Sequence, residues 1–479
     1  MLSCLLQRLR FHLCSLIVGW AVCLGPDIDV GGLEVDKMVI ARTSNVLRRI
    51  TTLLIISCLL TVGLCVNTAA ALPGSGTQAD PWRIQSLADF DEFAADPIYW
   101  AYWAWPGYTR LETDVNLAGR TYTTAVIAPD VNSDPYFDGT AFTGVFDGND
   151  HKITNLTIDG AGTRNSFVGL FGCIDEGEVR NLGLEDVFVS GDNHVGGLVG
   201  ANGDWGLPGG AISNCYSTGG VVGTGWYVAG LVGKNDYDIS NCCSTGSVRG
   251  SSYVGGLVGV NYATVSRCYS TGDVSGGGAV GGLVGSGGGG NISVCYSVGD
   301  VNGYSEIGGL VGSNGSWANV SNSYSTGDVN GVEDVGGLVG QNGWGNPISG
   351  DYPGYIYNSY STGNIEGTSY VGGLVGCNVA GDIERSFWDV ETSGEPNMCG
   401  GQWWATGCDP NCGKTTAEMQ TKSTFTEAGW DFVEIWLINE GATYPVLRQE
   451  IRSDLNGNGG VDMLDFAIFA DHWLEGTGD

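Results

Sequence analysis

The sequence predicts an all-β protein: a right-handed parallel β-helix, or β-solenoid, of about eight coils, followed by a small C-terminal α-helical, EF-hand-like calcium loop. The first observation is a recurring Gly-Gly-Leu-Val-Gly phrase, whose leucines from Leu170 to Leu374 lie 26 to 36 residues apart. A repeat of this length is typical of stacked arrays. The second is glycine, which makes up 81 of the 479 residues and disfavours helices, because each interior glycine costs a helix up to about 1 kcal/mol. The third is that the segments between glycines are short and rich in residues that favour strands.

Five segments follow one another along the chain. Residues 1–71 hold an N-terminal extension and signal peptide, 72–142 an N-terminal cap segment, 143–385 the repeats, 386–450 a closing segment, and 451–479 the calcium loop and its helix. Hydrophobic residues make up 42% of the chain and recur in register. The repeats are therefore expected to bury a continuous core rather than remain disordered.

An export signal is expected within the first segment rather than at Met1. Two arginines directly precede an apolar run from Ile50 to Val66, and Thr68–Ala71 offers small residues for cleavage. This order of charge, apolar run and small residues is typical of a secretory signal. A membrane anchor is the alternative for the apolar run, and a start at Met38 is the alternative to Met1. The sequence thus predicts a secreted protein, extracellular or on a bacterial cell surface.

The charge of the chain limits its partners. The formal net charge is -32, with 20 Lys and Arg against 52 Asp and Glu. Nucleic acid is not expected as a partner, because phosphate binding needs clustered basic residues. Divalent cations suit this much carboxylate. No later stretch has the roughly 18 consecutive apolar residues that a membrane helix needs, so the mature chain is not expected to span a membrane.

Equivalent residues of stacked coils form columns, with neighbouring coils about 4.8 Å apart. The leucine and valine columns are expected to fill the interior. An asparagine two residues after the repeated phrase is expected to form a structural hydrogen-bonded column: Asn202, Asn235, Asn261, Asn314, Asn342 and Asn378. Another column accepts cysteine or serine, which favours a small buried position over a disulfide framework: Cys215, Cys242, Cys268, Cys295, Ser323 and Ser359. Better disulfide candidates lie outside the repeats: Cys399, Cys408 and Cys412.

With its repeated phrase, the chain resembles bacterial proteins that carry the GLUG motif. Further likeness lies in Gly74–Thr77, Phe146–Asn149, Ser386–Asp389 and Lys414–Met419, so that the resemblance covers roughly residues 74 to 448. The resemblance implies an extracellular β-helical protein, often a surface or adhesin-like one, and it implies no catalytic residues.

The C-terminal segment carries a calcium-loop pattern. Oxygen ligands recur at the spacing of such a loop, with a glycine at the sharp turn; the candidate metal ligands are Asp454, Asn456, Asn458, Gly460, Asp462 and Asp465. The segment resembles one half of a dockerin, which implies Ca²⁺ as cofactor and a cohesin-like or cell-surface partner bound through residues 451–479. A complete dockerin has two such loops, and a plain turn before a terminal helix is the alternative.

Aromatic residues follow the asparagine column by one to three positions. An exposed strip of aromatic rings could stack on sugar rings, so these residues are candidate ligand-binding residues for a polysaccharide or other glycan: Trp205, Tyr237, Tyr262, Trp317 and Trp344. The alternative is that they only cap the corner of each coil.

Asp273, Asp300 and Asp328 form a further column, for which solvated turn residues are favoured over a ladder of calcium ions.

The sequence favours a protein that is not an enzyme. No Gly-x-Ser-x-Gly, phosphate-binding loop or zinc-protease motif is present, and no catalytic residue is predicted. The main hypothesis is a secreted, adhesin-like surface repeat protein that binds an extracellular ligand and carries a dockerin-like attachment tail. The alternative is a polysaccharide hydrolase or lyase, recruited by a dockerin–cohesin interaction in polysaccharide catabolism, since paired aspartates are abundant.

Overall fold

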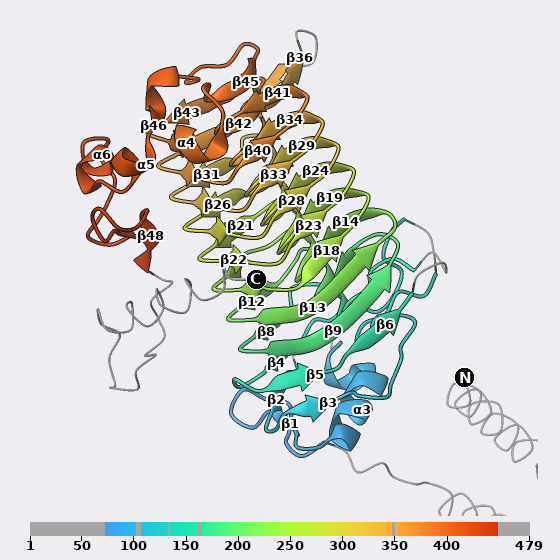
Figure 1. Ribbon diagram of the computed structural model, residues 1–479. Coiled ribbons are helices and arrows are strands. Elements are labelled where there is room, and N and C mark those ends of the chain that lie inside the picture. Colours follow the sequence, from blue (N-terminus) through green and yellow to red (C-terminus); the bar gives the residue numbers. More distant parts are fainter. Residues whose placement is uncertain (1–71, 102–106, 133–134, 161–164, 347–349, 449–479) are drawn as a thin grey trace, which may run out of the picture. The chain divides into compact units, whose positions relative to one another are not determined.

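The computed structural model describes residues 72–101, 107–132, 135–160, 165–346 and 350–448 (Figure 1). The predicted export signal and the predicted calcium loop at 451–479 lie outside the described residues. The fold is an all-β parallel solenoid, as predicted: strands from successive coils pair in parallel and in register along four sheets.

The first sheet has eleven strands: β1 (Trp82–Ile84), β2 (Tyr108–Leu111), β4 (Val145–Asp147), β8 (Glu178–Arg180), β12 (Ala211–Ser213), β16 (Ile239–Ser240), β21 (Thr264–Ser266), β26 (Asn291–Ser293), β31 (Asn319–Ser321), β38 (Tyr355–Tyr357) and β43 (Asp382–Glu384). The second has seven: β10 (Val195–Gly196), β14 (Trp226–Ala229), β19 (Ser252–Gly255), β24 (Gly278–Gly281), β29 (Ser305–Gly308), β34 (Glu333–Gly336) and β41 (Ser369–Gly372). The third has nine: β7 (Phe171–Ile174), β11 (Val199–Asn202), β15 (Val232–Asn235), β20 (Val258–Asn261), β25 (Val284–Ser286), β30 (Val311–Asn314), β35 (Val339–Asn342), β42 (Val375–Asn378) and β45 (Cys399–Gln402).

The fourth sheet takes one or two strands from each coil: β3 (Val115–Asn116), β5 (Lys152–Thr154), β6 (Thr157–Asp159), β9 (Gly183–Gly191), β13 (Tyr216–Gly223), β17 (Cys243–Ser244), β18 (Ser247–Arg249), β22 (Tyr269–Ser270), β23 (Val274–Ser275), β27 (Tyr296–Ser297), β28 (Val301–Asn302), β32 (Tyr324–Ser325), β33 (Val329–Asn330), β39 (Tyr360–Ser361), β40 (Ile365–Glu366), β44 (Phe387–Asp389) and β46 (Gly413–Lys414). Two antiparallel pairs stand apart: β36 (Trp344–Asn346) with β37 (Gly350–Tyr352), and β47 (Trp436–Leu437) with β48 (Val446–Leu447). The helices are α3 (Leu87–Ala95), α4 (Val390–Ser393), α5 (Thr416–Met419) and α6 (Lys422–Thr426), with the 3-10 turns η1 (Pro97–Tyr99) and η2 (Pro410–Cys412).

The stack is longer than the eight coils predicted, since the first sheet has eleven strands. The three additional strands are β1, β2 and β4, and they lie before the first Gly-Leu phrase. Their inward side chains Ile84, Leu111 and Phe146 are fully buried. Large apolar residues therefore fill the core of these coils without the glycine phrase, and a count of the phrase misses them.

The glycines of the repeated phrase are required by close backbone contacts. A Cβ on Gly255 would lie 1.9 Å from the Val258 carbonyl oxygen. A Cβ on Gly256 would lie 2.1 Å from both the Ser270 hydroxyl and the Gly282 carbonyl oxygen. Side chains cannot be accommodated at such distances, so the phrase marks the place where two strands of one coil and the next coil crowd together.

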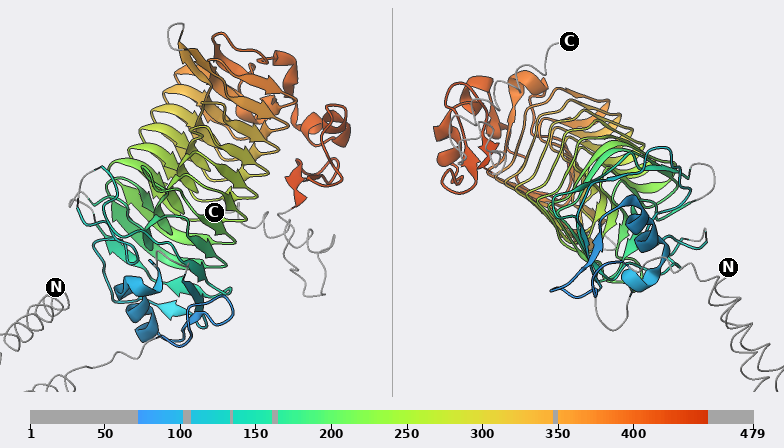
Figure 2. Two further views of the ribbon diagram at one scale, coloured as in Figure 1. Left: turned by 180° about the vertical axis from the view of Figure 1, so that it is seen from behind. Right: turned by 90° about the horizontal axis from the view of Figure 1, so that it is seen from below.

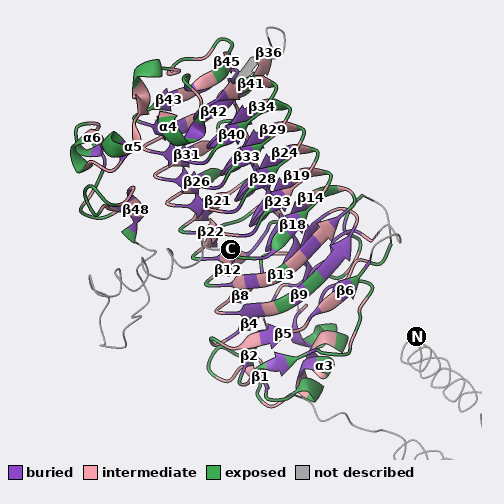
Figure 3. Ribbon diagram, viewed as in Figure 1, coloured by how far each residue is buried: buried purple, intermediate pink, exposed green. Residues whose placement is uncertain are grey.

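The interior follows the predicted columns. The repeated leucines are fully buried: Leu170, Leu198, Leu231, Leu257, Leu283, Leu310, Leu338 and Leu374. Figure 3 shows buried residues on the strands of successive coils. Because each coil adds the same apolar set, the core is continuous along the stack.

The asparagine column is a hydrogen-bonded ladder, as predicted. The side-chain amide of Asn202 donates to Asn235 at 2.8 Å, and that of Asn235 donates to Asn261 at 2.8 Å. The next coil carries Gly287 at this position, which interrupts the ladder. In the coils after it, the side-chain amide of Asn314 donates to Asn342 at 2.8 Å, and that of Asn342 donates to Asn378 at 3.0 Å. All six amides are fully buried, so the column is structural.

The cysteine column is also a buried structural feature, as predicted. Its cysteines and serines are almost fully buried, and the four cysteines are free thiols. The backbone N–H of Cys215 donates to the Cys242 sulfur at 3.4 Å, and the N–H of Cys295 donates to the Ser323 hydroxyl at 3.1 Å. Of the three cysteines outside the repeats, Cys399 and Cys408 form a disulfide, whereas Cys412 is free.

Additional elements cover the N-terminal coils and one face of the stack. Helix α3 begins after the N-cap Ser86 and buries Phe90 and Phe93 against the first coils. The closing elements α5, α6, β47 and β48 lie along one side of the stack (Figure 2). There they pack on a column of tyrosines from the fourth sheet. Among the described residues, no helix is long and apolar enough to cross a membrane.

Candidate ligand-binding surfaces

The five predicted aromatic residues lie on the loops or hairpin that follow strands of the third sheet. Their side chains are exposed: Trp205 85%, Tyr237 47%, Tyr262 49%, Trp317 60% and Trp344 53%. We call these five residues the corner aromatics. Trp205, Tyr237 and Tyr262 come from three successive coils. The next coil carries Gly287–Gly290 at this place, and Trp317 and Trp344 come from the two coils after it.

The corner aromatics do not form one continuous stack of rings. Trp205 contacts Tyr136, Trp317 contacts Tyr355, and Trp344 contacts Tyr352 on its own hairpin, with centroid distances of 6.3, 6.4 and 5.6 Å. The Lys234 ammonium lies 5.9 Å from the Tyr262 ring centroid. Trp205, Tyr262, Trp317 and Trp344 thus each have an aromatic or polar neighbour and stay 49–85% exposed, which is an arrangement that can stack on a ligand.

A second column was not predicted from the sequence. The residue before the inward valine or isoleucine of each second-sheet strand has a left-handed backbone, with φ between 49° and 63°: His194, Tyr227, Tyr253, Ala279, Glu306, Asp334 and Tyr370. We call this set the bulge column. Left-handed conformations are uncommon for residues other than glycine and are often found at functional positions. The only sequence signal is position, because the residue type changes from coil to coil.

Aromatic rings occupy one end of the bulge column. The His194 ring stacks on Phe167 at 4.4 Å between centroids, and Tyr227 stacks on Tyr253 at 5.3 Å. Burial lowers the pKa of His194 to about 4. Its imidazole is therefore neutral near pH 7, and it serves as a packed ring rather than as a charged group.

Two carboxyl groups lie side by side further along the bulge column, just before Tyr370. Ser305 pairs with Glu333 and Ile307 with Val335, so Glu306 and Asp334 are neighbours on adjacent strands. Burial raises the pKa of Glu306. Burial first, and then the charges of Glu306 and Glu333, raise the pKa of Asp334 to about 6. A carboxyl group that is partly protonated near neutral pH can donate a hydrogen bond as well as accept one.

The aspartate column is held by backbone hydrogen bonds. The N–H of Asp300 donates to the Asp273 carboxylate at 3.1 Å, that of Asp328 to Asp300 at 3.0 Å, and that of Asn364 to Asp328 at 2.9 Å. A cavity of about 180 Å³ lies beside it, lined by Asp300, Asn302, Asp328, Asn330, Asn364 and Glu366. Within the ranges that the structure describes, no group of three or more His, Cys, Asp or Glu residues could hold a metal ion. One oxygen of each aspartate is thus satisfied by the next coil, which favours turn residues over a calcium ladder.

Two known proteins are similar to parts of this chain. Halomucin from Haloquadratum walsbyi is 32% identical over 164 residues, which are 32% of this chain and 2% of halomucin. The match therefore spans a small part of that relative's length. The crystal structure of a candidate immunoglobulin A1 protease from Bacteroides ovatus aligns with a TM-score of 0.43 at 22% identity, over 78% of this chain and 94% of that chain.

The repeated phrase itself is matched by a family. The GLUG motif family matches residues 191–222, 250–275 and 303–330. Each of these ranges contains strands of the second and fourth sheets described above. The chain therefore carries three matched GLUG motifs, which lie within the coils of a parallel β-solenoid.

Proposed function

We propose that the chain is an exported surface repeat protein that binds extracellular polysaccharide through the corner aromatics. The observation that carries this proposal is that all five are exposed, although each ring is large enough to contribute substantially to a core. Because aromatic rings are exposed to water at the same position of several coils, a role in binding is favoured over a role in packing.

The repeat makes such a surface effective. One ring presents a weak site, whereas several rings on one rigid stack bind a polymer with an effective concentration that raises its overall affinity. The net charge of -32 disfavours strongly anionic polymers and favours neutral ones. The likeness to a segment of halomucin, a mucin by name, is consistent with a place outside the cell.

Attachment belongs to the same proposal. Residues 451–479 would bind Ca²⁺ through Asp454, Asn456, Asn458, Gly460, Asp462 and Asp465. The loaded segment would then hold the protein to a cohesin-like module or to another partner on a cell surface. The loop spacing supports this step, because it places oxygen ligands and a glycine where a calcium loop needs them.

Retention of the secreted chain on insoluble polysaccharides tests the proposal. The protein is passed over cellulose, xylan, mannan and chitin, beside the double variant Trp317→Ala/Trp344→Ala. The matched control is Tyr304→Ala, because Tyr304 is 61% exposed but precedes a second-sheet strand instead of following the asparagine column. Retention on at least one polymer, weakened in the double variant and unchanged in the control, is expected. Equal retention of all three proteins, or none at all, would refute the proposal.

Polysaccharide cleavage is the second candidate function. Glu306 and Asp334 favour it, because glycoside hydrolysis uses two carboxyl groups, one of them with a raised pKa, and these two residues are neighbours on adjacent strands. Release of reducing ends from a retained polymer, abolished by Glu306→Gln with retention intact, would establish this function. Retention without release supports binding alone.

A further inference from the structure

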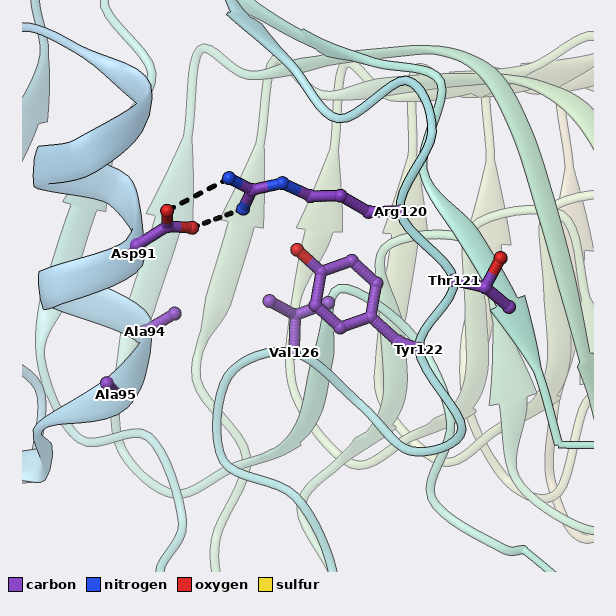
Figure 4. Close-up of a pocket in the computed structure, with 7 residues that line it drawn as sticks. All are labelled: Asp91, Ala94, Ala95, Arg120, Thr121, Tyr122 and Val126. Carbon is purple, nitrogen blue, oxygen red and sulfur yellow. Dashed lines mark hydrogen bonds and ion pairs between the residues drawn. The ribbon is translucent and has the colours of Figure 1, made fainter.

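A separate cavity lies near the N-terminal end of the stack. Its volume is about 500 Å³, and it is open to solvent between α3 and residues 120–126. Asp91, Ala94 and Ala95 of α3 face Arg120, Tyr122 and Val126 across it (Figure 4). Cavities of roughly 300–1,000 Å³ are the usual size of small-molecule sites.

An ion pair forms one wall of the cavity. The Arg120 guanidinium and the Asp91 carboxylate meet through two parallel contacts, Nη1 with Oδ1 and Nη2 with Oδ2, the second at 2.9 Å. The two side chains remain 33% and 48% exposed. Each therefore keeps unused hydrogen-bonding capacity toward the cavity, since a guanidinium has five N–H donors and a carboxylate about four acceptor positions.

Tyr122 and Val126 lie on the same side of the cavity as Arg120 and add an aromatic and an apolar surface, and the Tyr122 hydroxyl also hydrogen-bonds with the Arg120 side chain. The Tyr122 backbone is fixed to the solenoid, because it forms a parallel bridge with Ile158 and donates its N–H to the Thr157 carbonyl at 2.9 Å. Figure 4 shows the Tyr122 ring and Val126 extending toward α3, where only the methyl groups of Ala94 and Ala95 face them. The small side chains on the helix leave the space beside the ring open.

We propose that this cavity binds one neutral sugar ring. The Asp91–Arg120 ion pair presents hydrogen-bond acceptors beside hydrogen-bond donors, and adjacent sugar hydroxyls can donate to the first and accept from the second. The Tyr122 ring offers an apolar face to the C–H groups of a sugar. The two charges of the ion pair cancel and the whole chain is strongly acidic, so an anionic ring such as a uronate is disfavoured. This site does not rest on the corner aromatics, which lie on other loops, and it suits a free sugar or the terminal residue of a glycan.

Saturation-transfer NMR on the full secreted chain tests the site. The probes are glucose, galactose, mannose and glucuronate, each added alone. The first variant is Ala95→Phe, which fills the cavity but keeps the ion pair; Ala95 is exposed, so the thermal midpoint is expected to match that of the wild type. The second is Asp91→Asn, which keeps the shape but removes the charge. The companion is Trp317→Ala/Trp344→Ala, which leaves the cavity intact.

We expect transfer to at least one neutral sugar and none to glucuronate. The signal should fall at least tenfold in Ala95→Phe, fall in Asp91→Asn, and persist in the double tryptophan variant. Absence of transfer to every neutral sugar, transfer that survives Ala95→Phe, or transfer to glucuronate alone would overturn the inference. Transfer lost only in the tryptophan variant would also overturn it while supporting the corner aromatics, so the two proposals fail separately.

Discussion

Serines of the fourth sheet help to explain the second of the two consecutive glycines in the repeated phrase. Each serine hydroxyl points across the coil at the second glycine of a phrase. A Cβ on Gly282 would lie 2.2 Å from the Ser297 hydroxyl and 2.2 Å from the Gly309 carbonyl oxygen. The same contact recurs at Gly256 with Ser270, so the serine and the glycine form one structural unit of the repeat.

Replacement of Gly282 by alanine is therefore expected to destabilise the fold. The added methyl group would overpack a place with no free space, at a cost of about 1–3 kcal/mol or more. Urea unfolding followed by circular dichroism measures the loss. Gly220→Ala is the matched control, because the nearest atom to its Cβ would be 4.0 Å away. Equal stability of the two variants would show that the glycine is not required by packing.

Asp334 gives the fold a pH dependence of known sign. Its pKa rises from 3.8 to about 6 on folding, so the folded protein binds this proton more tightly than the unfolded chain. This stabilising effect is present at low pH and is lost as the pH rises from about 4 to about 6. Above that range the buried charge is a cost on the order of 1–2 kcal/mol, after allowance for screening by solvent.

Asp334→Asn removes that charge, so it should raise the free energy of unfolding at pH 8 and leave it nearly unchanged at pH 4. Urea unfolding of both proteins at the two pH values measures the difference. Glu427→Gln, at an exposed position, serves as the control and should show no such divergence. A stabilisation that is equal at both pH values would contradict the burial of the Asp334 charge.

At the scale of elements, a column of tyrosines joins the closing segment to the solenoid. Tyr269, Tyr296, Tyr324 and Tyr360 stack with centroid distances of 4.9, 5.2 and 4.9 Å along four successive coils. Trp436 of the closing segment is fully buried against Tyr324 and Tyr360. The Tyr360 hydroxyl also donates to the Pro445 carbonyl at 2.6 Å. The closing segment thus forms a second small core on the outside of the stack.

Trp436→Ala should release the closing segment without unfolding the coils. Loss of a buried tryptophan costs about 3–5 kcal/mol, and the coils keep their own continuous core. Hydrogen exchange followed by mass spectrometry is expected to show lost protection over residues 416–448 and unchanged protection over 239–320. Val433→Ala, at a side chain that is 74% exposed, should leave both regions protected. Loss of protection throughout the chain would mean that the two cores are one cooperative unit.

The sequence allowed most elements to be predicted, because the same contacts recur in every coil. The leucine column, the asparagine ladder and the buried cysteine column follow from residues that repeat in type and position. The coils of β1 and β2 could not be predicted in this way, because Ile84 and Leu111 fill the core there without the phrase, whereas β4 lies within the predicted repeat segment 143–385. Trp436 of the closing segment packs on tyrosines of the coils. This contact depends on tertiary structure, and no local sequence pattern indicates it.

The candidate surfaces were predictable to different degrees. The corner aromatics share a position after the asparagine column, and all five are exposed, while their role in ligand binding stays a prediction. The bulge column was not predictable, because its members range from histidine to aspartate and only the backbone conformation unites them. The cavity beside Arg120 joins a helix to a distant loop, so its two walls are unrelated in sequence.

At the scale of the whole molecule, the binding surface and the attachment segment are expected to act separately. Calorimetry should therefore detect one calcium site on the chain of residues 72–479 and none on a chain that ends at Glu450, because the candidate ligands begin at Asp454. Polysaccharide retention should be equal for the two chains. A calcium site that survives the truncation would place calcium on the solenoid instead and would contradict the assignment of the tail.

The most direct test of the central claim is a series of affinities for one soluble polysaccharide. Chains with one, two and three corner aromatics replaced by alanine (Trp317, then Trp344, then Trp205) are compared with the wild type by calorimetry. If the rings act together along the stack, the dissociation constant should rise at every step, by about twofold to twelvefold for each ring, as expected from about 0.5–1.5 kcal/mol per aromatic contact. An affinity that stays unchanged after all three replacements would show that the polysaccharide binds elsewhere and would contradict the account.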